Sequence, residues 1–242
     1  MYNLLKKSSK YLLGEIYYHL IKKYSERGNR ALIYHAFGSN LKHDTYGISI
    51  DIKKFIQHME YIADNYETTH INNTDSNEIN ISVTIDDGYK DTLNAVDILT
   101  KKNIPFTLYI SPGHLDKNDY LSSKDLKDIS LLNECIIGAH GYSHRKLITL
   151  DKTQQKIELQ KSKIVLEDLI DKDVNTLSYP HGLFNQDTIS IAKELGYFSA
   201  ASSIKGFNNI NTHPFKMRRI EVIASDKLKE LSKKIKGHYD FY

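Results

Sequence analysis

Hydrophobic residues along the chain form two kinds of segment: short continuous runs, and longer stretches with one apolar face at helical spacing. The runs predict buried strands and the longer stretches predict amphipathic helices. Because the two kinds alternate, the strands are expected to pair in parallel through helical crossovers, which gives an α/β sheet or barrel. The expected strands are residues 30–38, 81–85, 106–111, 135–140, 198–203 and 218–223, and the expected helices are residues 50–66, 91–103, 123–129, 151–171 and 186–196, with a last basic helix from Ser225.

The limits of these elements follow from capping and loop residues. Ser49 is the expected N-cap of the helix over residues 50–66, and a polar stretch at residues 71–80 separates this helix from the next strand. No internal repeat, low-complexity tract or Pro/Gly-rich linker interrupts the pattern. With 242 residues, the chain therefore fits one large domain.

The first residues are interpreted as a separate element, an amphipathic basic helix over residues 1–28. Two hypotheses are open for it: contact with a membrane surface through residues 1–25, or packing at the edge of the domain. The segment lacks the continuous apolar core and the cleavage site of a secretory signal, and it is too short in apolar residues to span a bilayer. Its apolar face is formed by Leu13, Ile16, Leu20 and Tyr24, and its charge by Lys6, Lys7, Lys10, Lys22 and Lys23.

Charge and cysteine content narrow the classes of function. The chain has 33 Lys and Arg against 30 Asp and Glu, a formal net charge of +3, and no long basic block with interleaved aromatics. Nucleic acid is therefore not expected as a partner. Cys135 is the only cysteine, so any metal has to be held by His, Asp or Glu. Glycine-rich and Walker phosphate-binding loops are absent, which argues against a nucleotide cofactor.

Two adjacent carboxylates follow the strand over residues 81–85. In the sequence TIDDG, Asp86 and Asp87 would point to opposite sides if the strand continued through them, because side chains alternate faces along a strand. One place in the fold could then offer two carboxylates with different functions. Asp and Gly are also common turn residues, so a simple polar turn is the alternative.

A histidine pair follows the strand over residues 135–140. His140 and His144 are four residues apart, a spacing that allows two imidazoles to face one metal ion. An α/β barrel places its active groups where strands end, which is where this pair lies. Two His and either Asp86 or Asp87 would leave open metal positions for water and substrate. The remaining Asp could accept the proton of that water.

Three motifs in this order resemble those of the polysaccharide deacetylases, the carbohydrate esterases that share the NodB homology domain. They are TIDDG (residues 84–88), HGYSH (residues 140–144) and SYPHG (residues 178–182), and the similarity extends to LIYHAFG before them and RRIEV after them. The resemblance implies a single-domain distorted (β/α) barrel, which here would cover residues 29–242.

The resemblance also implies functions for residues of the first two motifs. Asp86 would be the general base, and Asp87, His140 and His144 would bind a divalent metal, with Zn²⁺ expected and Co²⁺ or Ni²⁺ as alternatives. Gly141 stands where the family usually has Ser or Thr. A hydrogen bond that braces this loop is therefore expected to be missing.

The third motif is matched in part. Pro180 is retained, and His181 replaces a Tyr whose backbone N–H helps to hold the oxyanion in the family, a donor that His181 can also supply. No Arg precedes Pro180 in the family's position, so the sequence does not identify the group that orients Asp86. The family's late Leu-x-His, which contains the general acid, is not evident. His213 is the candidate for that role by position, with His35 and His181 after it, and an ordinary loop histidine is the alternative.

The resemblance implies a metal-dependent hydrolase that removes the N-acetyl group from an amino sugar of a cell-surface polysaccharide or its precursor, a cleavage of a non-peptide C–N bond. The alternatives are a deformylase or deacetylase of a lipid-linked amino sugar, and a glycan-binding protein with weak turnover. The expected partner is an N-acetylated glycan or a lipid-linked amino sugar. A cytoplasmic location is expected, with the inner face of the membrane as the alternative site. Tyr89, Tyr142 and Tyr179 are candidates for stacking on sugar rings because each adjoins a motif.

Overall fold

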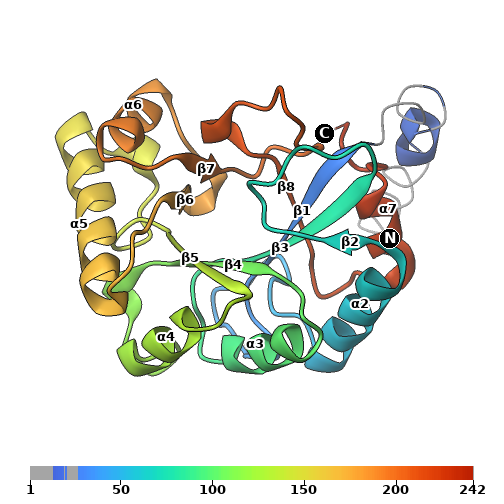
Figure 1. Ribbon diagram of the computed structural model, residues 1–242, viewed down its shortest axis with the longest axis horizontal. Coiled ribbons are helices and arrows are strands. Elements are labelled where there is room, and N and C mark those ends of the chain that lie inside the picture. The colour runs from blue at the N-terminus through green and yellow to red at the C-terminus, as the bar shows by residue number, and fades with distance from the viewer. Residues whose placement is uncertain (1–12, 19, 21–26, 242) are drawn as a thin grey trace.

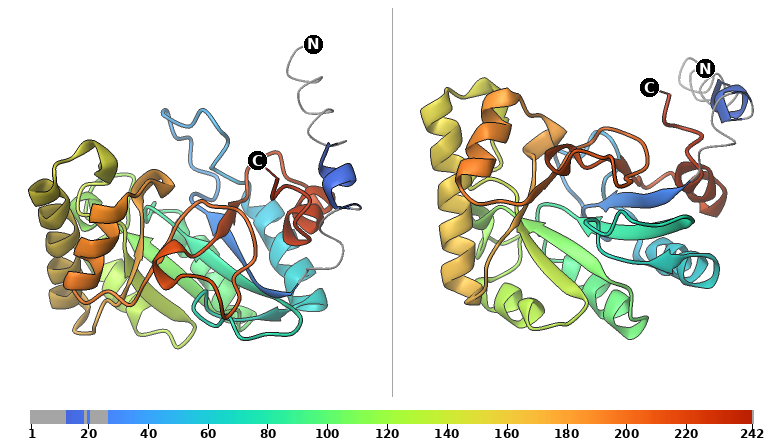
Figure 2. Two further views of the ribbon diagram at one scale, coloured as in Figure 1. Left: turned by 90° about the horizontal axis from the view of Figure 1, so that it is seen from above. Right: turned by 45° about the horizontal axis from the view of Figure 1, so that its top comes forward.

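The computed structural model describes residues 13–18, 20 and 27–241, and within them eight strands form one curved sheet that nearly closes into a barrel (Figure 1). Helices lie along the outside of the sheet (Figure 2). The predicted α/β barrel is therefore confirmed. The strands are β1 (Gly28–Tyr34), β2 (Glu67–Thr68), β3 (Ile79–Ile85), β4 (Phe106–Ile110), β5 (Cys135–Ala139), β6 (Thr176–Ser178), β7 (Ser199–Ala201) and β8 (Arg219–Glu221), and the helices are α2 (Ile52–Asn65), α3 (Thr92–Lys101), α4 (Ser123–Ser130), α5 (Lys152–Ile170), α6 (Gln186–Glu194) and α7 (Leu228–Ile235).

The strands are joined in the order β7-β6-β5-β4-β3-β1-β8, and β2 pairs with the start of β3. Every one of these pairs is parallel, as expected for strands connected by helices. The two edge strands approach each other through a bridge between Ala201 and Met217, where the Ser202 N–H donates to the Met217 carbonyl at 2.8 Å. The carboxyl ends of the strands from β7 to β8 in this order consequently surround one opening, where the sequence motifs lie.

Side chains alternate between the two faces of the sheet, and the inner face is unusually polar. Asn29 of β1 donates to Asn80 and to Ser82 of β3, and Tyr109 of β4 lies 3.2 Å from Thr176 of β6. The outer face carries apolar residues that pack beneath the helices, including Leu32, Val83 and Leu108. Burial of this outer layer supplies most of the hydrophobic stabilisation, while hydrogen bonds satisfy the polar groups inside.

Some predicted limits are corrected. The N-cap of α2 is Asp51, whose carboxylate accepts from the N–H groups of Lys53 and Lys54, and not Ser49. The Ser49 hydroxyl instead donates to the Ser39 carbonyl in the preceding loop. The two-residue strand β2 was not predicted, because it follows α2 directly and has no apolar run of its own.

Of the predicted N-terminal helix, residues 13–17 are α-helical, and the rest of residues 1–28 lies largely outside the described residues, as Tyr24 does. Leu13, Ile16 and Leu20 are exposed. No helix among the described residues combines the length and the apolarity needed to cross a bilayer.

Candidate active site

A cavity of about 630 Å³ opens at the carboxyl ends of the strands. It brings together residues from all three sequence motifs and from the loop after β1. This confirms that the motifs, which are distant in sequence, converge at one place. The lining includes His35, Asp86, Asp87, Tyr89, His114, Tyr120, His140, His144 and His181.

A turn directs both adjacent carboxylates into this cavity. β3 ends at Ile85, and Asp87 adopts a left-handed backbone conformation with φ 74°. The alternation of a continuing strand is therefore interrupted, and Asp86 and Asp87 do not point to opposite sides. Their oxygens lie 3.8 Å and 3.4 Å from Nε2 of His140. The glycine that follows, Gly88, also has a positive φ of 75° and completes the turn.

Asp87, His140 and His144 form a group with metal-ligand geometry. Oδ1 of Asp87 lies 3.4 Å from Nε2 of His140 and 3.2 Å from Nε2 of His144, and the three atoms are all within 4.8 Å of one another. Ligand atoms about 2.0–2.1 Å from a tetrahedral Zn²⁺ are about 3.3 Å apart, so the spacing fits. Oδ1 of Asp87 is buried and accepts no hydrogen bond from a described residue. A buried anionic oxygen without a donor fits a cation.

Hydrogen bonds to neighbouring residues orient His140. Nδ1 of His140 lies 2.8 Å from the Ser178 carbonyl, so this nitrogen carries the proton and Nε2 presents its lone pair toward Asp87. The backbone of His140 is held as well, because the Ser111 hydroxyl donates to its carbonyl at 2.7 Å. Burial opposes protonation of His140, but the carboxylates of Asp86 and Asp87 outweigh it and raise the pKa of the imidazole.

The loop that carries His144 is braced from α5. The backbone N–H of Ser143 donates to the Glu158 carboxylate at 2.9 Å, and the Ser143 hydroxyl donates to the same carboxylate at 2.7 Å. A loop-bracing hydrogen bond was expected to be missing because residue 141 is Gly. The Ser143 hydroxyl supplies such a bond instead. Gly141 itself has φ +67°, and a Cβ there would lie 3.1 Å from Pro180. Burial lowers the pKa of His144 to about 3, with help from the neighbouring His140, so His144 is neutral and able to bind metal.

Arg219 of β8 is the group that orients Asp86. Its guanidinium donates to both carboxylate oxygens, at 2.7 Å and 2.8 Å, and to the hydroxyls of Thr84 and Ser178. Burial alone would raise the pKa of Asp86, but the Arg219 charge outweighs it and keeps the carboxyl ionised. The family arginine that is absent before Pro180 therefore has a substitute. The sequence signal was an arginine inside the apolar segment RRIEVI, to which no function was assigned.

His181 lies beside the metal group. Its φ of 59° is left-handed, and its ring centroid is 4.5 Å from that of His144. Of the six described non-glycine residues with positive φ, three belong to this site: Asp87, His144 and His181. Backbone strain of this kind is retained where surrounding contacts enforce it, and it concentrates at functional sites.

The structure places the candidates for the general acid differently with respect to the cavity. His213 is exposed, precedes the 3₁₀ turn at Pro214–Lys216, and accepts from the Phe215 N–H through Nδ1. It does not line the cavity. His35 does line it, and Nδ1 of His35 is a buried atom without a hydrogen-bond partner among the described residues.

The three tyrosine candidates for stacking on sugar rings also differ in position with respect to the cavity. Tyr179 is fully buried and donates to the Phe215 carbonyl, and Tyr142 is not among the residues that line the cavity. Tyr89 lines it, with its hydroxyl 2.9 Å from Nε2 of His43. Other lining aromatics and imidazoles were not predicted, because they come from loops without a motif: His43, Tyr46, His114 and Tyr120.

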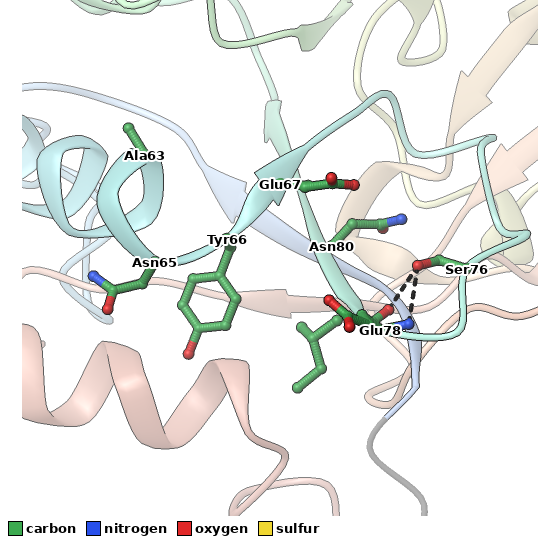
Figure 3. Close-up of a pocket in the computed structure, with 8 residues that line it drawn as sticks. Ala63, Asn65, Tyr66, Glu67, Ser76, Glu78 and Asn80 are labelled. Carbon is green, nitrogen blue, oxygen red and sulfur yellow. Dashed lines mark hydrogen bonds between the residues drawn. The ribbon is translucent and has the colours of Figure 1, made fainter.

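A second hollow lies at the opposite end of β3, beside the end of α2 and β2 (Figure 3). The Ser76 hydroxyl there accepts from the Glu78 N–H and donates to the Glu78 carbonyl. Ile79 and Asp86 are seven residues apart along β3, which is roughly 23 Å of strand. This hollow is therefore distinct from the site with the metal-ligand geometry.

Comparison with known proteins agrees with the geometry. The family model described as Polysaccharide deacetylase matches residues 73–200, more than half of the chain. YxkH of Bacillus subtilis, named for the same family, is 23% identical over 201 residues, which are 79% of this chain and 70% of that protein. The poly-beta-1,6-N-acetyl-D-glucosamine N-deacetylase of Staphylococcus aureus is 26% identical over 160 residues, 61% of this chain but only 55% of that enzyme.

The fold has close structural neighbours. The crystal structure of a polysaccharide deacetylase from Bacillus cereus superposes with a TM-score of 0.77 at 24% identity, over 86% of this chain and 69% of that one. At this identity the superposition establishes the fold, a nearly closed and distorted parallel barrel. With the family match and the convergence of the three motifs on one cavity, it shows that the chain belongs to the polysaccharide deacetylase family.

Proposed function

We propose that the protein is a metal-dependent N-deacetylase of an amino sugar within a glycan. The observation that carries the proposal is the pairing of two unlike carboxylates: Asp87 faces the two histidines, and Asp86 is bound by Arg219. Such a pair separates a metal ligand from a proton acceptor within one turn. Family membership supports a polysaccharide substrate, and the proposal adds the N-acetyl group and the amino sugar.

Asp87, His140 and His144 would hold the divalent metal, with Zn²⁺ proposed. When bound there, such an ion lowers the pKa of water and polarises an amide carbonyl. Asp86 accepts the proton of the attacking water, and Arg219 keeps its carboxylate charged and aimed. The backbone N–H of His181 donates to the oxygen that becomes negative when water adds to the carbonyl.

His35 is the proposed general acid. It follows the end of β1 and lines the cavity, and its buried Nδ1 has no hydrogen-bond partner among the described residues. The leaving amine needs a proton as the C–N bond breaks, and imidazole is the side chain most often used for this. The exposed His213 outside the cavity would have no access to that nitrogen, which favours His35 among the histidines considered.

The substrate is proposed by analogy with one relative. The staphylococcal enzyme acts, by its name, on poly-beta-1,6-N-acetyl-D-glucosamine. We extend this to a β-linked N-acetylated glycan as substrate of the present protein. A lipid-linked amino sugar at a membrane surface is the second candidate, because Leu13, Ile16 and Leu20 present exposed apolar side chains along one helical face. A cytoplasmic step at the inner face of the membrane is part of that second candidate.

Acetate and formate release from N-acylated amino-sugar oligomers and lipid-linked amino sugars tests the proposal, with Zn²⁺ or Co²⁺ added. Release of acetate from glycan oligomers supports an N-deacetylase. Release of formate, or release from lipid-linked sugars alone, supports the second candidate. Tight metal binding without release from any substrate would contradict both and support a glycan-binding protein.

A further inference from the structure

The loop between β1 and α2 forms one wall of the cavity and stands out from the body of the protein (Figure 2, left). Five consecutive or nearly consecutive residues of this loop line the cavity. None of them belongs to the three motifs, and the proposed chemistry uses none of them. They are His43, Asp44, Thr45, Tyr46 and Ile48.

This wall is fixed at its base by Asp91, the last residue of the segment TIDDGYKD. Although Asp91 precedes α3, its side chain does not cap that helix. One carboxylate oxygen instead accepts from the N–H groups of Phe37 and Ser39, at 2.7 Å and 2.8 Å. Hydrogen bonds to a charged acceptor are stronger than neutral ones, so the start of the loop is anchored next to the catalytic turn.

The tip of the loop is fixed by a second carboxylate. Asp44 accepts from the N–H groups of Tyr46, Gly47 and Ser49, at 3.0 Å, 2.6 Å and 3.3 Å. The Gly47 carbonyl in turn accepts from the Ala224 N–H at 2.6 Å. Ordering a loop costs roughly 1–2 kcal/mol of backbone entropy per residue, which these bonds offset.

The ordered tip leaves one large ring uncovered. Tyr46 is 79% exposed, although it lines the cavity. Folding therefore gains little from burying this side chain, while the turn built by Asp44 holds its backbone in one place. An aromatic face is an apolar surface that suits the C–H face of a sugar ring, and the tyrosine hydroxyl stays in water.

We propose that Tyr46 is the stacking platform of a second sugar subsite, which binds the unit of an N-acetylated glycan adjacent to the unit being deacetylated. This inference rests on the proposed function. The cavity volume lies within the range of roughly 300–1,000 Å³ typical of ligand sites, and the polar groups Lys146 and Glu221 on the lining can bind sugar hydroxyls. The enzyme would therefore prefer oligomers to the free monosaccharide.

A tryptophan reporter tests this placement, because the chain contains no Trp. Tyr46→Trp would be made in an Asp86→Asn background that blocks turnover, and titrated with N-acetylglucosamine and with its β-1,4- and β-1,6-linked tetramers. We expect a blue shift of emission that saturates at lower concentration with a tetramer than with the monosaccharide. Phe198→Trp is the matched control, since Phe198 is 71% exposed but does not line the cavity, and its emission should not change.

Calorimetry and turnover separate this inference from the proposed function. Tetramer binding detected by calorimetry without a change at Tyr46→Trp would overturn the subsite, and so would an absence of any tetramer binding. A fluorescence response without acetate release from the wild type would leave the subsite standing and contradict the deacetylase. In an active enzyme, Tyr46→Ala should lower kcat/KM by about tenfold for a tetramer and by less for the monosaccharide. Equal losses on both substrates would overturn the subsite.

Discussion

Arg219 and Asp86 form a buried, two-pronged ion pair between residues 133 positions apart in the sequence. Arg219 lies on β8 and Asp86 follows β3; β1 lies between these two strands in the sheet, so the ion pair spans β1. Both side chains are nearly inaccessible to water. The charge and the direction of Asp86 are consequently set by a strand outside the three motifs.

Replacing Arg219 with methionine should impair both stability and turnover. Removing one partner leaves the other charge buried and unpaired, and such changes reduce the free energy of unfolding by about 3–5 kcal/mol. Denaturant unfolding at pH 7 measures this loss. Arg218→Lys is the matched control, because the Arg218 side chain is exposed and the change should be nearly neutral. Equal stability of Arg219→Met and Arg218→Lys would show that the pair does not constrain Asp86.

Ser143→Ala should weaken metal binding without changing any proposed ligand. The variant loses the hydroxyl bond to Glu158 that braces the loop of His144. Loss of such supporting contacts lowers metal affinity by about 10–100-fold. Isothermal titration with Zn²⁺ measures the change. Ser190→Ala, on the exposed face of α6, is the control and should bind like the wild type; equal affinity of the two variants would contradict the bracing function.

His35→Gln should reduce hydrolysis of amides far more than hydrolysis of activated esters. An amine must be protonated as it leaves, whereas a nitrophenolate leaves without a proton, so loss of the acid affects only the former. General acid catalysis contributes roughly 10²–10⁴-fold. Rates on an N-acetylated sugar oligomer and on nitrophenyl acetate provide the comparison. If His213→Gln shows this selective loss and His35→Gln does not, then His213 is the acid.

His58 should make stability decrease with acidity. It lies fully buried on the inner face of α2, its Nδ1 is 3.2 Å from the Tyr34 hydroxyl, and burial lowers its pKa from 6.5 to about 4. Protonation therefore favours the unfolded chain. The contribution is complete above pH 6.5, is lost as the pH falls toward 4, and amounts to about 2 kcal/mol between pH 8 and pH 5.

Urea unfolding in the presence of a chelator, at pH 8 and at pH 5, tests this prediction. The decrease in the free energy of unfolding should be smaller in His58→Gln than in the wild type, by about 2 kcal/mol. An unchanged decrease would show that other groups account for the acid sensitivity.

Much of the fold and the metal group could be predicted from the sequence, since both depend on local patterns. Alternating apolar runs and helical faces predict an α/β sheet or barrel, and the resemblance carried by the three motifs implies the barrel form and the group Asp87, His140 and His144. The geometry of the turn at Asp86 and Asp87 was harder to predict from the sequence. The strand ends at Ile85 and Asp87 is left-handed, so the condition under which the two carboxylates would point to opposite sides is not met, and the turn that was kept as the alternative is what forms.

Contacts across the barrel could not be predicted at all from local patterns. Arg219 acquires its function only when β8 pairs with β1, one strand away from β3, and the cavity wall with Tyr46 only when the loop after β1 is placed over the motifs. His35, in the segment LIYHAFG, was predicted only as a candidate for the acid after His213, because the sequence does not show which of these histidines lines the cavity. Such groups are brought together by topology, and sequence spacing carries little information about them.

The division of work between the two adjacent carboxylates is tested most directly by measuring Zn²⁺ binding and acetate release together in Asp86→Asn and Asp87→Asn. We expect Asp86→Asn to bind Zn²⁺ like the wild type but to release acetate at least about 10²-fold more slowly, and Asp87→Asn to lose both properties. Loss of Zn²⁺ binding in Asp86→Asn, or acetate release by that variant at the wild-type rate, would contradict the assignment of Asp86 as the base and Asp87 as the metal ligand.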